Sequence, residues 1–160
     1  MRRTLLIGAL ALAIGLLVYL TDRATGHAQW LPAMPGWAAS GSFGSFGAIG
    51  AWLPSLAHVL GFSLLSAAWL PPPAHPAACA SWCVIDLGFE CGQHASVAPL
   101  LAAWLAQWSP GLPGAEALQR YFLRGRFDPL DLLACIAGAG LALMILRWPR
   151  RPHSGDGHAP

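Results

Sequence analysis

Residues 79–93 have the sequence CASWCVIDLGFECGQ, which combines the composition of a membrane-spanning helix with three acidic or amide side chains. These residues are Asp86, Glu90 and Gln93, and most of the residues between them are apolar. Ionisable groups are costly in the hydrocarbon of a bilayer, so those that occur there are usually paired and usually functional. The segment therefore predicts a membrane protein with a polar site inside its membrane domain.

The composition of the whole chain fits a membrane protein. Its 160 residues are 56% hydrophobic and 10% charged, whereas soluble domains average about 25% charged residues. The formal net charge of +2 is too small to suggest a nucleic-acid partner. We expect one compact membrane domain, because the chain is too short for a membrane region and several further domains.

Four segments are long and apolar enough to cross a bilayer, which takes about 17–25 residues. They predict an all-α fold, a four-helix transmembrane bundle. Two short helices are expected between the third and fourth spans, in the outer membrane interface, where tryptophan side chains are favoured. The expected spans are 4–20, 51–70, 77–97 and 130–146, with outer segments at 21–50 and 98–128 and a disordered cytoplasmic tail at 147–160.

Arginines at the two ends of the chain set the expected orientation. Arg2 and Arg3 precede the first span and Arg147 follows the fourth. Basic flanks favour the cytoplasmic side, so we expect both termini there. The N-terminal segment could instead be a signal peptide with a cleavage-like site at residues 26–28. We expect a retained anchor.

The polar residues of the third span lie along one helical face. Positions three and four apart share a face of an α-helix, so Asp86, Glu90 and Gln93 point the same way. At a rise of about 1.5 Å per residue, Asp86 lies near the middle of the bilayer and the other two lie nearer the outer surface. Asp86 is therefore the most costly of these residues, and it has no obvious partner within the chain.

Residues from neighbouring spans extend this face into a candidate cluster. His58 of the second span should lie close to the height of Glu90. Arg124 and Arg126 come just before the fourth span, where a guanidinium can pair with Glu90 or bind an external phosphate or carboxylate. The candidate ligand-binding or structural cluster is His58, Asp86, Glu90, Gln93, Arg124, Arg126 and Asp131.

Purely structural roles stay open for several polar residues. Asp128 suits an N-cap, and Asp131 could serve as an anion in the first turn of the fourth span. Glu90 paired with an arginine could simply hold the outer segment in place. The four cysteines lack the spacing of a zinc or redox site, and a disulfide between Cys91 and Cys135 is conceivable. We expect no metal and no cofactor.

The order of the polar residues resembles the VanZ-like family of small bacterial integral membrane proteins. His58 is followed by Glu90-x-x-Gln93 at the end of the third span. Residues 126–131, with the sequence RFDPLD, then lead into a last span that is rich in Gly and Ala. The resemblance covers roughly residues 51–146. It implies four spans, a location in the bacterial inner membrane and a polar site that faces outward.

Two functional hypotheses follow. The first is a periplasm-facing polar pocket that binds an anionic envelope ligand, such as a lipid headgroup or a cell-wall precursor. The second is a non-catalytic accessory subunit that packs against other membrane subunits. An enzyme with Glu90 or His58 as general acid or base lacks a nucleophile motif. Proton conduction lacks a polar path at the inner end of the third span.

Overall fold

The computed structural model describes residues 1–23, 46–109 and 111–148, and these residues contain helices and turns but no strand. The predicted all-α class is therefore confirmed. Most of the expected loop 21–50, the cleavage-like site at 26–28 and nearly all of the expected tail 147–160 lie outside the described residues. The elements are α1 (Arg2–Val18), η1 (Tyr19–Arg23), α3 (Gly47–Ala67), η3 (Pro72–Ala74), α4 (His75–Gly92), α5 (Ala98–Trp108), α6 (Ala115–Arg124) and α7 (Pro129–Arg147).

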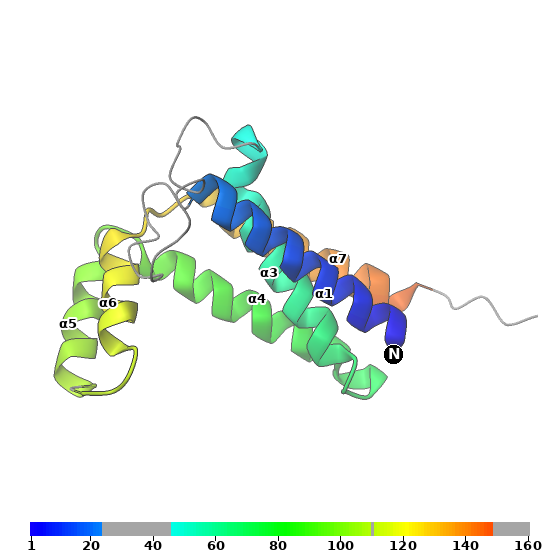
Figure 1. The fold of residues 1–160 in the computed structure, drawn as a ribbon. Coiled ribbons are helices and arrows are strands. Elements are labelled where there is room, and N and C mark those ends of the chain that lie inside the picture. The colour runs from blue at the N-terminus through cyan, green and yellow to red at the C-terminus, as the bar shows by residue number, and fades with distance from the viewer. Residues whose placement is uncertain (24–45, 110, 149–160) are drawn as a thin grey trace, which may run out of the picture.

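Helix α3 lies at the centre of the bundle, in contact with α1, α4 and α7, and α4 also packs against α7. The four long helices run antiparallel in chain order (Figure 1). The start of α1, the η3 turn and the end of α7 therefore meet at one end of the bundle, which we call the terminal end. The opposite end carries α5 and α6, and we call it the hairpin end (Figure 1).

Three helical segments are long and apolar enough to cross a membrane: Arg2–Thr21, Ile49–Ala67 and Pro129–Arg147. Helix α4 is not among them, although it is 18 residues long. Its Asp86 and Glu90 lower its mean hydropathy. The expected membrane bundle is thus supported as an all-helical assembly with three candidate spans.

The boundaries of α4 differ in part from the expectation. The helix begins at His75 with Pro76 in its first turn, which suits a residue without an amide N–H. It ends at Gly92 rather than at residue 97, and the chain turns over residues 93–97 before α5 begins. Pro99 then lies in the first turn of α5. The helix therefore breaks at residues 93–97, before Pro99, and the proline lies where a new helix begins rather than inside a continuous one.

The two short helices expected between the third and fourth spans are present as α5 and α6, which pack against each other. They run crosswise to α4 beyond the end of the bundle (Figure 1). Phe122 of α6 fits against Gly92 at the end of α4, where a Cβ atom would lie 2.5 Å from the ring. On α5, Leu100, Trp104 and Trp108 are exposed at a spacing of four residues, which places them on one face.

Small residues allow α3 to approach its neighbours closely. A Cβ atom at Gly8 of α1 would lie 3.0 Å from the Gly61 carbonyl oxygen, and one at Gly138 of α7 would lie 2.6 Å from the Leu56 carbonyl oxygen. Close approach of this kind is how helices associate within membranes. The buried side of α7 includes the residues Asp131, Cys135, Gly138 and Ala142.

Candidate functional site

A buried polar cluster lies where α3, α4 and α7 meet. Its three carboxyl groups are almost inaccessible, since Asp86 is 7%, Glu90 9% and Asp131 2% exposed. All three lie close enough to the buried thiol of Cys135 to act on it electrostatically. A carboxyl group removed from water needs hydrogen-bonding or charged partners. The partners of these groups therefore define the site.

Asp86 is paired with His58, with 2.7 Å between Asp86 Oδ2 and His58 Nδ1. The sequence shows no obvious partner for Asp86 within the chain, and the structure supplies His58 as that partner. The sequence places the turn between the second and third spans at residues 71–76. Helix α3 instead ends at Ala67, and α4 begins at His75. Because residues equally far from the turn of an antiparallel pair lie side by side, this earlier turn brings His58 opposite Asp86 rather than Glu90.

The His58 side chain stays partly open although Asp86 is enclosed. Its exposed fraction is 49%, against 9% for the Asp86 side chain. Phe62 meets the imidazole edge to face, with 4.6 Å between ring centroids, and stacks on Trp82 at 4.5 Å. The Trp82 indole N–H donates to Ser66 Oγ at 2.8 Å. This aromatic stack fixes α3 against α4 and holds His58 at the edge of the contact.

Asp131 is held at the start of α7 by α3. The Ser55 hydroxyl donates to Asp131 Oδ1 at 2.9 Å. Asp128 is the N-cap of the same helix, as predicted, and its Oδ1 accepts from the Leu130 amide at 2.9 Å. Ser55 was not among the predicted site residues. It lies three residues before His58, on the same helical face, and that spacing is the signal that could have identified it.

Three predicted members are not among the buried residues of the cluster. Gln93 donates from Nε2 to the Tyr121 hydroxyl of α6 at 2.6 Å, so it connects α4 to the hairpin end. Arg126 is exposed and forms no hydrogen bond or ion pair with any residue that the structure describes. Arg124 is exposed as the last residue of α6. The structure therefore buries Asp86, Glu90 and Asp131 together and pairs His58 with Asp86.

The four cysteines are free, and the conceivable disulfide between Cys91 and Cys135 is not formed. Cys91 is exposed, whereas Cys135 is buried in the polar cluster. Within the described ranges, no group of three or more His, Cys, Asp or Glu side chains has an arrangement that could hold a metal ion.

The His58–Asp86 pair supplies one defined chemical function. A carboxylate that accepts from Nδ1–H fixes the imidazole tautomer and leaves Nε2 to accept or donate a hydrogen bond according to its protonation.

Comparison with protein-family models, curated proteins and solved structures found no match to this chain. The resemblance to the VanZ-like family stays a prediction.

Proposed function

We propose that this chain is an integral membrane protein with four spanning helices, α1, α3, α4 and α7, and that it acts as a non-catalytic subunit of a larger membrane complex. The 18 residues of α4 extend about 27 Å at ~1.5 Å per residue, close to the ~30 Å of a hydrocarbon core. Its Asp86 and Glu90 are buried, while Val84, Ile85 and Phe89 are exposed. An apolar outer face with enclosed carboxyl groups suits a fourth span.

The proposed location is a bacterial inner membrane with both termini in the cytoplasm. Arg2, Arg3 and Arg147 all belong to helix ends at the terminal end of the bundle. Basic residues that flank spanning helices favour the cytoplasmic side. The hairpin end would then face the periplasm, with Trp104 and Trp108 of α5 exposed at the level of the lipid headgroups.

The half-exposed imidazole of His58 is the observation that carries the proposal. His58 lies near the middle of a candidate span, and its Nε2 forms no hydrogen bond within the described part of the chain. A polar nitrogen that faces hydrocarbon is unfavourable, because lipid offers it no hydrogen bond. A helix of another subunit with a hydroxyl, amide or carbonyl group at the same depth would cover it. The partner is therefore expected on the His58 side of the α3–α4 pair.

Site-specific photo-crosslinking in native membranes tests this assignment. A photoreactive amino acid at position 85, next to Asp86 in α4, is expected to form a discrete adduct with a partner polypeptide. Position 136 of α7 is the matched control, since Ile85 and Ile136 are both exposed isoleucines of long helices. The adduct at position 85 should disappear when His58 is replaced by leucine. Equal adduct formation at both positions, or none at position 85, would contradict the proposal.

A second candidate function, the binding of an anionic envelope ligand, is favoured by Arg126. This arginine is exposed between α6 and α7, and no described residue neutralises its charge. An arginine binds phosphate or carboxylate groups through two parallel hydrogen bonds. A lipid headgroup or a cell-wall precursor at the periplasmic surface would supply such a group. Buried Glu90 and Asp131 lie in the neighbouring helices α4 and α7.

Replacement of Arg126 by glutamine separates this candidate from the first. Loss of a charge-assisted hydrogen bond is expected to weaken binding of an anionic lipid or precursor by about tenfold. Arg120→Gln is the control, because Arg120 is another exposed arginine of the hairpin end and already faces Glu116 at 3.4 Å. Binding can be measured by native mass spectrometry of the purified full-length chain. Equal affinities in the two variants would count against the ligand hypothesis.

A further inference from the structure

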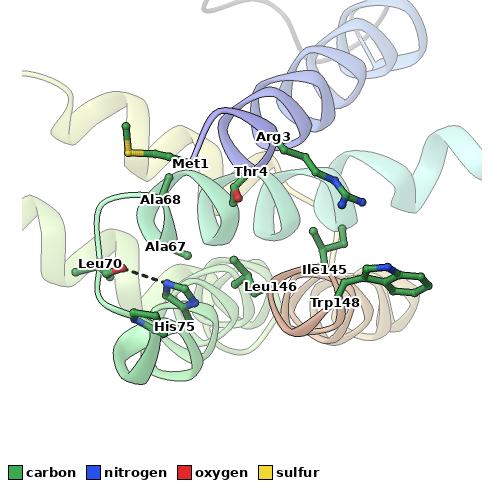
Figure 2. A pocket seen from close by; sticks show the side chains of 11 residues that line it. Met1, Arg3, Thr4, Ala67, Ala68, Leu70, His75, Ile145, Leu146 and Trp148 are labelled. Atoms are coloured by element: carbon green, nitrogen blue, oxygen red, sulfur yellow. Dashed lines mark hydrogen bonds between the residues drawn. The ribbon is translucent and has the colours of Figure 1, made fainter. Parts of the chain in front are cut away.

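A cavity of about 330 Å³ lies at the terminal end of the bundle, away from the His58–Asp86 pair (Figure 2). It lies between the first turn of α1, the end of α3, the η3 turn and the end of α7. Its volume falls within the range of roughly 300–1,000 Å³ that is typical of ligand pockets. Nothing in the proposed function uses it.

Two polar side chains of this cavity form no hydrogen bond within the part of the chain that the structure describes. Arg3 and Thr4 of α1 line it, and neither side chain forms a hydrogen bond or ion pair with any described residue. Figure 2 shows the Thr4 hydroxyl directed from α1 toward Leu146 of α7. His75 Nε2–H donates to the Leu70 carbonyl oxygen at 3.1 Å on the opposite wall. The two side chains without a described partner, Arg3 and Thr4, therefore both come from the first turn of α1.

The electrostatic balance of this end is positive. No carboxyl group lines the cavity, and Arg2 and Arg147 belong to the same helix ends as the lining residues. The acidic residues of the described chain belong to the polar cluster or to segments of the hairpin end. They are Asp22, Asp86, Glu90, Glu116, Asp128 and Asp131. Among the residues that the structure describes, an anion in the cavity would thus meet cationic groups and no carboxylate.

We propose that the cavity binds a phosphate-bearing anion, with the Arg3 guanidinium and the Thr4 hydroxyl as its hydrogen-bond donors. A guanidinium matches the geometry of a phosphate, and a neighbouring hydroxyl adds a third donor. The phosphate comes either from an anionic phospholipid or from a soluble phosphate. Ile145 and Leu146 give the cavity an apolar wall at the end of a candidate span, which suits the glycerol and first acyl carbons of a lipid.

Native mass spectrometry of the purified full-length chain in detergent tests the site with three probes. The probes are phosphatidylglycerol, phosphatidylcholine with the same acyl chains, and inorganic phosphate. One phosphatidylglycerol is expected to bind more tightly than phosphatidylcholine. Arg3→Gln should weaken this binding by about tenfold, as expected for a lost charge-assisted hydrogen bond. Thr4→Val, which keeps the shape of the side chain, should weaken it by roughly threefold.

Arg2→Gln is the matched control, since Arg2 is the neighbouring exposed arginine and does not line the cavity. Tight binding of inorganic phosphate with the same dependence on Arg3 would support the site and identify a soluble phosphate as the ligand. Equal binding of the two lipids without phosphate binding would overturn the proposal. Equal losses in Arg2→Gln and Arg3→Gln would overturn it as well. Ala68→Leu, which fills the cavity from α3, should abolish binding independently of charge.

Discussion

Alanine in place of Gly138 is expected to destabilise the folded bundle by about 1–3 kcal/mol, the range typical of overpacked interiors. The added Cβ atom would lie 2.6 Å from the Leu56 carbonyl oxygen and 3.2 Å from Val59 Cβ. The carbonyl group belongs to the backbone of α3 and cannot turn aside as a side chain can. Helices α3 and α7 must therefore move apart. The hydrogen bond from Ser55 to Asp131 spans the same contact and would lengthen with them.

Gly140 provides the matched control within the same helix. A Cβ atom at that position would meet no atom within 4 Å. Gly140→Ala should therefore be neutral, or stabilising by up to about 1 kcal/mol through the higher helix propensity of alanine. Both variants can be compared by denaturant unfolding of the full-length chain in micelles, followed by circular dichroism. A loss of stability of the same size in both would show that α3 and α7 are not in close contact at Gly138.

The sequence predicts the helices of this chain well because each depends on local signals. Long apolar runs locate α1, α3 and α7 within a few residues. Asp128 and Pro129 mark the start of α7, since the N-cap and the first turn have local chemical requirements. Small residues at helical spacing also identify the buried side of α7, where Gly138 permits close packing. These features need no knowledge of distant contacts.

The register between helices is not encoded locally, and this is where the predicted site differs from the structure. The sequence predicts His58 at the height of Glu90, because hydropathy alone does not reveal that α3 ends at Ala67 and α4 begins at His75. Gln93 is predicted on the polar face because it lies three residues after Glu90, although the helix ends at Gly92. The contact between Gly92 and Phe122 joins residues far apart in the chain. Helical periodicity cannot supply such contacts.

Leucine at either His58 or Asp86 is expected to destabilise the protein, whereas leucine at both positions should restore most of the lost stability. His58→Leu leaves the enclosed Asp86 carboxyl group without its 2.7 Å partner and should cost about 2 kcal/mol. Asp86→Leu leaves a half-exposed imidazole and should cost about 1 kcal/mol. Replacement of both polar partners by apolar side chains is often close to neutral. We therefore expect the double variant within about 1 kcal/mol of the wild type.

Equilibrium unfolding of the four proteins in micelles completes a double-mutant cycle, and a coupling free energy of about 1–2 kcal/mol is expected. Additive losses would show that His58 and Asp86 do not act as a pair. The double variant also separates stability from function, because it restores the packing of α3 on α4 without restoring Nε2. A subunit that recognises His58 should fail to crosslink at position 85 of this stable protein. A crosslink that survives in the double variant would mean that the partner contacts apolar residues of α3 and α4, with His58 serving only to hold Asp86 in place.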